Sequence, residues 1–404
     1  MKLISILITL NSLFLVTHIN GQNDIKSEIL RSFNKINSIN LEQKDDTDLE
    51  NFGKAVANSR IVFLGEQDHG DAPTFIAKTR LIKYLHEKMD FDVLVFESDF
   101  WALNRVWENQ INDTTLINQI RENTYRIWAN CIQTQELYSY LNQSLKKRDT
   151  LFVSGVDCRH VAPYTVKNYI NELIVFTKSQ PALMSDSVTL NNFIYLTRKI
   201  IDKEYKVKVS KEEKQWIIEY LDKVTANITD PFWKQEFVNL KGGALNSFEF
   251  NYMSPIRDIY MAKNLVWLYR EKYAGKKIIV WAHSTHNAKN TDKIPKQVNT
   301  SMGNEIYKTL QDSIYDLGFT SLTGTAGRVL IKEKYKVEKV KADSFEAWIS
   351  AMNVNYGFVN FKNINNNTPF YMKGLSHTAN KTDWTKIFDG VFYIKNMYPC
   401  DKTE

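Results

Sequence analysis

A chain of 404 residues in which 43% are hydrophobic and 13% aromatic can bury one large core or two smaller ones, which excludes a disordered protein. Its formal net charge is only +6, and the basic residues are dispersed among acidic ones rather than gathered in a stripe. This charge pattern excludes the usual nucleic-acid-binding surface, so no nucleic-acid partner is expected.

Residues 1–21 have the order of a secretory signal peptide. Lys2 precedes a mostly apolar run over residues 4–16, and a polar stretch ends at Gly21. The apolar run is shorter than the roughly 20 residues that span a bilayer, so an uncleaved anchor is the less favoured alternative. We therefore expect an exported protein, periplasmic or secreted, in which residues 22–404 form the working domain and no membrane span remains.

Four short apolar runs, each followed by polar or acidic residues, predict buried parallel strands at 60–64, 92–96, 150–156 and 277–281. Helical periodicity lies between them, at 74–88, 133–147, 164–177 and 255–273. Further strands are expected at 315–320, 328–331 and 390–394. The alternation predicts an α/β fold with a mostly parallel central sheet flanked by helices.

The region 179–246 has a different pattern, with charged and aromatic helical stretches such as 211–222 and little strand signal. We expect a helical insertion or cap there. As a cap it would cover the ligand-binding edge of the sheet and offer apolar surface to a substrate. A plain packing role is the equal alternative.

The three cysteines, Cys131, Cys158 and Cys400, lack the paired spacing typical of a zinc or redox site. An exported compartment permits a disulfide between Cys131 and Cys158. Buried thiols are at least as well supported, and no chemistry is assigned to the cysteines.

The strongest functional pattern is a pair of histidine-bearing segments, LGEQDHG at 64–70 and VWAHSTH at 280–286, which hold three of the seven histidines. Each follows a predicted strand, and ligand sites in open α/β sheets lie beyond the carboxyl ends of such strands. Glu66, His69, His283 and His286 are therefore expected to meet at one cleft. The alternative for any one of the histidines is a hydrogen-bonded support role.

His69 suits a general base, because a histidine near neutral pKa can take a proton from water while a carboxylate on its other nitrogen fixes the tautomer. Glu66 is the candidate for that carboxylate. Glu97, after the next strand, is a second candidate carboxylate, with a helix N-terminal role as its alternative. His283 and His286 are expected to stabilise a developing oxyanion. Metal binding is their less favoured role, because the helical His-Glu-x-x-His spacing is absent.

Three more residues are candidates for substrate binding or support. Lys78, in the helix after His69, would neutralise an anionic intermediate, although a solvated lysine is commoner. Asp157 follows the third strand and would support the site electrostatically. Arg257, which begins a helix together with Asp258, has a capped helix start as its alternative. His160 is expected to lie outside the site, in the turn after Asp157.

In their order along the chain, these segments resemble the erythromycin esterase-like proteins, hydrolases whose better-known members open the lactone ring of macrolide antibiotics. The matching segments are 64–70, 96–97, 128–136, 155–157, 257–262, 281–286, 301–303 and 388–390. The resemblance implies a metal-independent hydrolysis in which His69 activates water against a carbonyl. It also implies that Glu66, Glu97, His283 and His286 are the other active-site residues, with Lys78 as the basic residue of the following helix.

We therefore expect an exported hydrolase that cleaves a small-molecule ester or lactone without a cofactor, with macrolide ring opening, and hence antibiotic resistance, as one candidate. One alternative is a metal-dependent hydrolase that uses the same His and Glu residues. Another is a non-catalytic protein that binds an apolar ligand beneath the helical cap. Binding alone does not require so many titratable groups in one cleft, which favours an enzyme.

Overall fold

The computed structural model describes residues 24–110, 114–147, 149–180, 186–201, 208–248, 254–294 and 300–403. The expected signal peptide, residues 1–21, lies outside the described residues. Among the helices of the described ranges, none is long and apolar enough to cross a bilayer.

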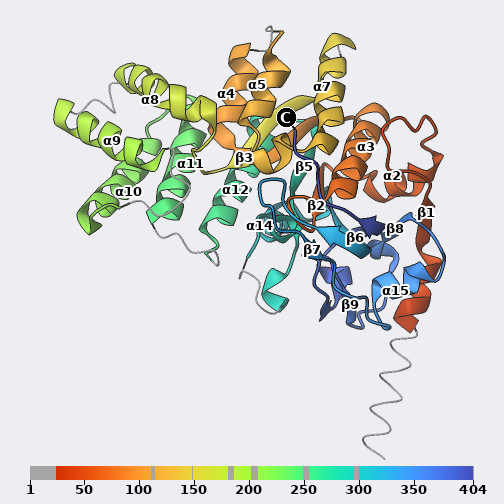
Figure 1. Cartoon of the computed structure of the whole chain (residues 1–404). Coiled ribbons are helices and arrows are strands. Elements are labelled where there is room, and N and C mark those ends of the chain that lie inside the picture. Colours follow the sequence, from red (N-terminus) through yellow and green to blue (C-terminus); the bar gives the residue numbers. More distant parts are fainter. Residues whose placement is uncertain are drawn as a thin grey trace, which may run out of the picture.

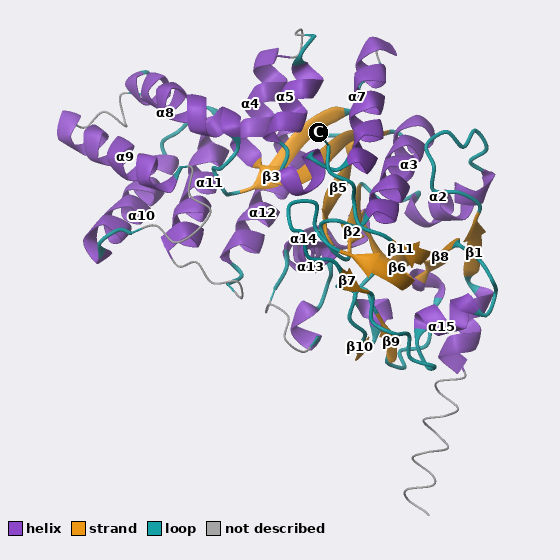
Figure 2. Cartoon of the chain, in the orientation of Figure 1, coloured by secondary structure: helices purple, strands orange, loops and turns teal. Residues whose placement is uncertain are grey.

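A nine-stranded sheet lies at the centre of the described chain, in the order β1-β8-β11-β6-β2-β5-β3-β4, with β7 paired to β6 (Figures 1 and 2). The six strands from β11 to β4 run parallel to one another, whereas β8 is antiparallel to β1 and β11, and β7 is antiparallel to β6. The strands are β1 (Phe33–Ile36), β2 (Ile61–Glu66), β3 (Phe91–Asp99), β4 (Phe152–Asp157), β5 (Lys277–His283), β6 (Ile314–Ala326), β7 (Tyr335–Lys336), β8 (Tyr356–Asn360) and β11 (Gly390–Met397). A separate small sheet pairs β9 (Phe370–Met372) with β10 (Asn380–Thr382). The predicted α/β fold with a mostly parallel sheet is confirmed.

Helices cover both faces of the sheet (Figure 2). The helices of the chain include α2 (Glu50–Val56), α3 (Ala72–Met89), α4 (Phe100–Gln110), α5 (Leu116–Asn123), α6 (Arg126–Ala129), α7 (Gln135–Lys147), α8 (Pro163–Lys178), α9 (Ser187–Ile200), α10 (Lys211–Thr225), α11 (Pro231–Phe248), α12 (Ile256–Trp267), α13 (Ser284–Asn287), α14 (Met302–Leu310) and α15 (Phe345–Ser350). In β2, Val62 and Leu64 pack in one core with α3, whereas Ile61 and Phe63 pack in another with α12 and α14. This alternation explains why the strand reads as a continuous apolar run.

The expected strand at 328–331 is wrong. Gly327 has a φ of +154°, a conformation that glycine adopts easily, and it turns the chain out of β6. The chain returns to β6 only at the two residues of β7. The apolar side chains of Leu330 and Ile331, which suggested a strand, are exposed instead.

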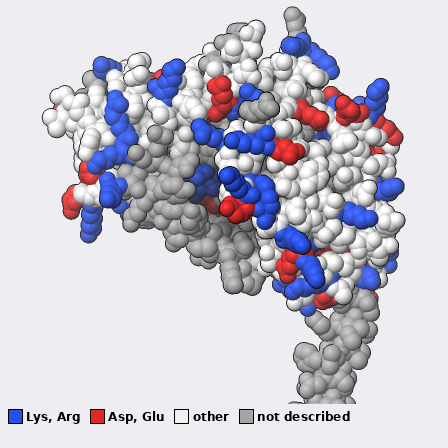
Figure 3. Space-filling model, in the orientation of Figure 1, with Lys and Arg blue, Asp and Glu red and all other residues white. Residues whose placement is uncertain are grey.

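Helices α9, α10 and α11 occupy most of the region 179–246, and together with α8 they form a helical lobe with its own apolar core. The lobe lies on the left of Figure 1, beside β3 and α12. The lobe contacts the rest of the chain through α11, where Gly242 packs against Tyr260 of α12. Helix α12 in turn packs on the sheet. On the face in Figure 3, basic and acidic side chains are interspersed, and the surface is hollowed between this lobe and the rest of the chain.

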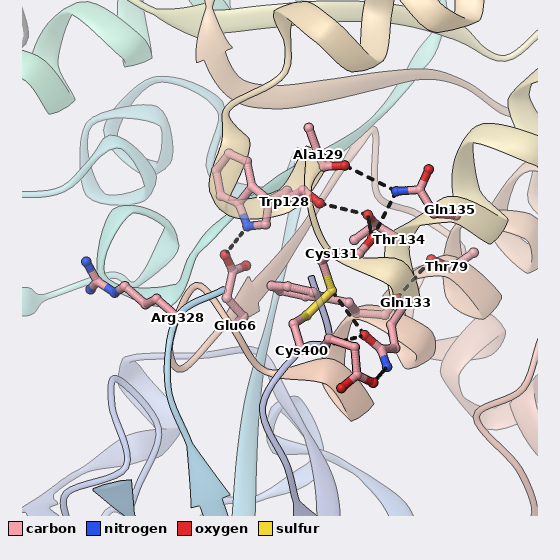
Figure 4. The surroundings of a disulfide bond; sticks show 12 residues. Glu66, Thr79, Trp128, Ala129, Cys131, Gln133, Thr134, Gln135, Arg328 and Cys400 are labelled. Carbon is pink, nitrogen blue, oxygen red and sulfur yellow. Dashed lines mark hydrogen bonds between the residues drawn. A yellow bond between two sulfur atoms is a disulfide. The ribbon is translucent and has the colours of Figure 1, made fainter. Parts of the chain in front are cut away.

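The cysteine pairing differs from the expected Cys131–Cys158 alternative. Cys131 forms a disulfide with Cys400, and Cys158 is a buried free thiol (Figure 4). The bonded cysteines are 269 positions apart in the sequence. They meet because the C-terminal residues run back along the turn after α6, a tertiary contact that the spacing of cysteines cannot reveal.

Candidate active site

The carboxyl ends of four neighbouring strands lie side by side at one edge of the sheet. Glu66 ends β2 and pairs in register with His283 at the end of β5. Glu97 lies near the end of β3, which neighbours β5, and Asp157 ends β4. The structure therefore brings together the strand ends that carry the residues singled out from the sequence.

Glu66 is the buried centre of the first cluster. It is fully buried, and the Lys78 ammonium forms an ion pair with Oε2. The Trp128 indole N–H donates to Oε1 at 2.8 Å, and Nδ1 of His69 lies 3.2 Å from the same oxygen. Burial alone would raise the pKa of Glu66, but Lys78 and His69 outweigh burial and lower it. Glu66 is therefore a carboxylate, and its Oε1 accepts a hydrogen bond from the Nδ1–H of His69.

This arrangement leaves Nε2 of His69 as the nitrogen with a lone pair. The His69 side chain is 15% exposed, and its ring packs edge-on against Trp128 and His283 at centroid distances of 5.4 and 4.8 Å. Among the described residues, Nε2 has no hydrogen-bond partner, and it is the ring atom on the side opposite Glu66. The geometry suits a general base whose tautomer is set by a carboxylate.

The turn that carries His69 is held by contacts from a distant part of the chain. Oδ1 of Asp68 accepts from the His69 backbone N–H at 2.8 Å and from Nε of Arg328, also at 2.8 Å. Gly70 packs against the backbone of Gly327, where a Cβ would lie 2.1 Å from the carbonyl oxygen. A side chain at position 70 would therefore displace the turn, which explains the glycine after His69.

Glu97 is the centre of the second cluster. Its Oε1 accepts from Nη2 of Arg257 at 2.7 Å and lies 3.2 Å from Nε2 of His286. Its Oε2 accepts from the His283 backbone N–H at 3.0 Å. Burial alone would raise the pKa of Glu97, but His286 and Arg257 hold it well below its usual range. Glu97 is therefore ionised, and its charge holds the strand end and two cationic side chains together.

His286 is a cation at neutral pH in this environment. Its Nδ1 donates to Oδ1 of Asp258 at 2.8 Å, and the same oxygen accepts from the Met302 backbone N–H. Burial opposes the charged ring, and Nη1 of Arg257 lies 3.0 Å from Nε2, yet Asp258 and Glu97 raise the pKa of His286 to about 10. A protonated His286 can stabilise negative charge but cannot take a proton from water.

Asp157 fixes the position of Arg257 through hydrogen bonds. Its carboxylate is fully buried and accepts from Nε and Nη2 of Arg257, from Nε of Arg159 and from the Tyr125 hydroxyl. Burial would raise the pKa of Asp157, but Arg159 and Arg257 lower it well below the usual range. The pair of bonds to Arg257 fixes the plane of that guanidinium, as a bidentate carboxylate contact does.

His283 is neutral. Its Nδ1 accepts from the backbone N–H and hydroxyl of Thr285, and its Nε2–H donates to the Gln67 carbonyl at 3.0 Å. Burial and the neighbouring His69 lower the pKa of His283 to about 3. Both ring nitrogens are thus engaged, and His283 connects the end of β5 to the turn that carries His69.

Lys78 and Asp157 differ from the expected substrate contacts, because both are fully buried and paired with other side chains. The sequence interpretation also gave no role to Trp128, and it treated Asp258 only as a helix start. Asp258 is adjacent in sequence to the candidate Arg257, so its place in the site, where it pairs with His286, could have been predicted. Trp128 reaches Glu66 from α6, and only the resemblance of the segment 128–136 pointed toward it.

The donor set does not fit a resident metal ion. Among the described residues, no group of three or more His, Cys, Asp or Glu side chains is arranged to hold one. The carboxylates of Glu66 and Glu97 face the cations Lys78 and Arg257, and Nε2 of His283 faces a carbonyl oxygen. A divalent ion at these oxygens would have to displace the cations that already neutralise them.

The raised pKa of His286 predicts a pH-dependent contribution to stability. Because the folded-state pKa of about 10 lies above the unfolded value of about 6.5, the contribution is complete below pH 6.5 and is lost as the pH rises through about 10. We expect His286→Gln to lower the melting temperature most below pH 6.5, with the difference from the unaltered protein shrinking toward pH 10. Thermal unfolding between pH 6 and 10.5 measures this, with His86→Gln as control. A difference that stays constant with pH would contradict a charged His286.

The fold and the histidine–carboxylate clusters define an α/β enzyme with a site at the carboxyl edge of its sheet. The family model described as Erythromycin esterase matches residues 86–396, so the chain belongs to the erythromycin esterase family. Similar curated proteins agree. The proposed hydrolase YbfO of Bacillus subtilis (strain 168) is 25% identical over 396 residues, with 87% of each chain covered. Erythromycin esterase type II of Escherichia coli is 21% identical over 404 residues, with 88% of this chain and 94% of that protein covered. The chain is a hydrolase.

Solved structures share the fold. A succinoglycan biosynthesis protein superimposes with a TM-score of 0.76 at 17% identity, covering 94% of this chain and 98% of its own. A mutant of the erythromycin esterase EreC in its open conformation gives a TM-score of 0.69 at 15% identity, covering 91% and 98%. At these identities the likeness concerns the fold.

Proposed function

We propose that this protein is an exported hydrolase that cleaves a small-molecule ester or lactone with water activated by His69. The observation that carries the proposal is the orientation of that ring. Its Nδ1 faces the fully buried Glu66, and its Nε2 is left without a partner among the described residues. A general base needs this combination of a fixed tautomer and an accessible lone pair.

In the proposed reaction, Nε2 of His69 removes a proton from a water molecule as its oxygen attacks the ester carbonyl. Glu66 stabilises the imidazolium that forms, and Lys78 and Trp128 hold Glu66 in place for this purpose. His69 then returns the proton to the leaving alcohol as the tetrahedral intermediate collapses. The products are a carboxylic acid and an alcohol, which in a lactone remain parts of one opened chain.

Negative charge develops on the carbonyl oxygen during the attack, and this charge needs a fixed cation or hydrogen-bond donor. His286 and Arg257 are the two cations that contact Glu97, and both are partly exposed, with 16% and 17% of their side chains accessible. We assign them to the oxyanion. His283 would support the reaction indirectly, because its Nε2–H bonds the turn before His69.

The names of the relatives suggest a macrolide lactone as one substrate, since one curated relative is an erythromycin esterase. At 21% identity this extends to the present chain only as a candidate. We propose the wider class of esters and lactones, with no metal cofactor. The engagement of Glu66 and Glu97 by cations supports metal independence.

Export is supported by the disulfide between Cys131 and Cys400. Disulfides persist in oxidising compartments such as the periplasm or the medium, and they are rare in the bacterial or eukaryotic cytosol. The order of charges and apolar residues over 1–21 agrees. Mass spectrometry of the mature chain from the fraction in which it accumulates would show an N-terminus near residue 22, and an intact Met1 would contradict cleavage.

The first experiment is mass spectrometry of macrolide lactones and simple esters incubated with the purified mature chain, with and without an exhaustive chelator. A lactone should gain the mass of one water, or an ester should give acid and alcohol, in both conditions. Loss of turnover on chelation, restored by a metal ion, would establish the metal-dependent alternative. Tight binding of a compound that stays chemically unchanged would favour a binding protein.

A further inference from the structure

The last residues of the described chain run between two segments of the site. Residues 398–403, which we call the C-terminal strap, follow directly after β11. On one side the Cys400 N–H donates to the Gly70 carbonyl at 2.8 Å, and the Ala72 N–H donates to the Tyr398 carbonyl at 3.1 Å. The strap is therefore hydrogen-bonded to the turn between His69 and the first residue of α3.

On its other side the strap holds the turn that follows α6. The Ile132 N–H donates to the Asp401 carbonyl at 2.9 Å, and the Thr403 N–H donates to the Asn130 carbonyl at 2.8 Å. The side-chain amide of Gln133 donates to Asp401 at 2.9 Å. The strap thus joins two segments that are far apart in sequence and that both lead into the site.

The disulfide closes this arrangement. Cys131 lies in the turn and Cys400 in the strap, with their Cα atoms 5.5 Å apart. Figure 4 shows the bridge between the turn after α6 and the C-terminal strap, with Glu66 beside the ring of Trp128, which lies in α6. The Cys131 N–H also donates to the Trp128 carbonyl at 3.0 Å. The position of the Trp128 backbone is therefore coupled to the position of the bridge within one helical turn.

We propose that the C-terminal strap, closed by the Cys131–Cys400 disulfide, is a positioning element for the catalytic pair Glu66–His69, and that it makes the site sensitive to reduction. The inference rests on the proposed role of His69. Trp128 transmits the effect, because its indole N–H donates to the same Oε1 of Glu66 that faces Nδ1 of His69.

The disulfide adds a covalent bond to a small set of weaker contacts. The four backbone hydrogen bonds named above join the strap to the two turns, and Tyr398, Asp401 and Lys402 are exposed, so the strap can open locally once the bridge is broken. A dithiol such as dithiothreitol would donate two electrons and two protons, so that the S–S bond becomes two thiols and the dithiol becomes a cyclic disulfide. The strap and the turn would then open locally, and Trp128 would lose its fixed position against Glu66.

The indole N–H signals test the coupling without any substrate. The chain has nine tryptophans, and Trp128→Phe identifies the resonance of Trp128 in a proton–nitrogen correlation spectrum. In the oxidised protein this proton should be shifted downfield and protected from exchange, because it donates to a carboxylate. After reduction we expect the shift to move upfield and the protection to fall, while the other indoles change little. An unchanged Trp128 resonance would overturn the proposal, whatever the protein hydrolyses.

Turnover then tests the consequence for catalysis. Reduction of the unaltered protein should lower kcat by about tenfold, a fraction of what a general base contributes, with KM nearly unchanged. Reduction should also raise the apparent pKa of the acidic limb of the pH profile of kcat/KM, because the charged form of Glu66 loses the hydrogen bond from the Trp128 indole. Trp128→Phe should show the same two changes without reduction, and reduction should add little to them.

The paired variant Cys131→Ser/Cys400→Ser is the matched control. It should behave like the reduced protein and should not respond to dithiothreitol, which separates the bridge from other effects of the reagent. If reduction lowers only the melting temperature and leaves kcat and the pH profile unchanged, the bridge is merely structural and the proposal fails. It fails equally if reduction changes Trp128→Phe as much as the unaltered protein.

Discussion

Replacing His69 with Ala is expected to lower kcat for ester or lactone hydrolysis by about 10²–10⁴-fold, the range that general acid–base catalysis contributes. The physical reason is that no other imidazole of the site can replace it. Both nitrogens of His283 are engaged, and His286 is held protonated by Asp258 and Glu97. KM should change little, because Nε2 acts on water rather than on the bound substrate. Steady-state kinetics of the purified variant measure both constants.

His86→Ala is the control for the loss of an imidazole. His86 lies in the same helix that follows the His69 turn, where its Nδ1 bonds to the Tyr140 hydroxyl outside the site. This variant should keep kcat when assayed below its melting temperature. If His69→Ala kept the kcat of the unaltered protein on a good substrate, the assignment of the general base would be wrong.

The fold was accessible from the sequence because its parallel strands are buried on both faces. Such strands appear as continuous apolar runs, and the four expected at 60–64, 92–96, 150–156 and 277–281 correspond to β2, β3, β4 and β5. The same criterion failed at 328–331, where apolar residues lie on an exposed turn after Gly327. Periodicity reports the pattern of side chains but cannot show whether a neighbouring strand is present to pair with them.

The candidate residues could be located, whereas their partners could not. The rule that ligand sites lie at the carboxyl ends of strands led to Glu66, His69 and Glu97 without any knowledge of contacts. Which cation neutralises which carboxylate depends on helices that cross these ends. Lys78 therefore appeared as a substrate-binding residue, although the structure buries it against Glu66.

Long-range contacts explain the remaining differences. Trp128 and Cys400 reach the neighbourhood of Glu66 from positions 62 residues and more than 300 residues away along the chain. No local pattern encodes such pairs, because a single hydrogen bond or disulfide constrains two positions and leaves those between them free. The protonation states follow the same logic, since His283 and His286 differ only in what surrounds them.

The largest stability effect is expected at Arg257. Replacing it with Met leaves Glu97 and Asp157 buried without their shared cation, and removal of one partner of a buried ion pair costs about 3–5 kcal/mol of unfolding free energy. The variant should also lose about 10²-fold in kcat, as removal of an oxyanion donor does. Arg257→Lys keeps the charge but not the bonds from Nε and Nη2 to the two oxygens of Asp157, so its stability and kcat should fall between those of Arg257→Met and the unaltered protein.

Lowering the pH should partly restore the unfolding free energy that Arg257→Met loses. Without the guanidinium, the pKa of each carboxyl group in the folded state should rise, because burial is then opposed mainly by His286 at Glu97 and mainly by Arg159 at Asp157, and protonated carboxyl groups need no cation. The loss of unfolding free energy should therefore be largest near pH 8 and should shrink as the pH falls toward 4. Urea unfolding at several pH values measures this. Arg105→Met is the matched control, because Arg105 pairs with the partly exposed Glu172 and such pairs contribute about 0–1 kcal/mol. If both variants lost the same unfolding free energy at every pH, Arg257 would behave as an ordinary surface cation, and its assignment to the oxyanion would be wrong.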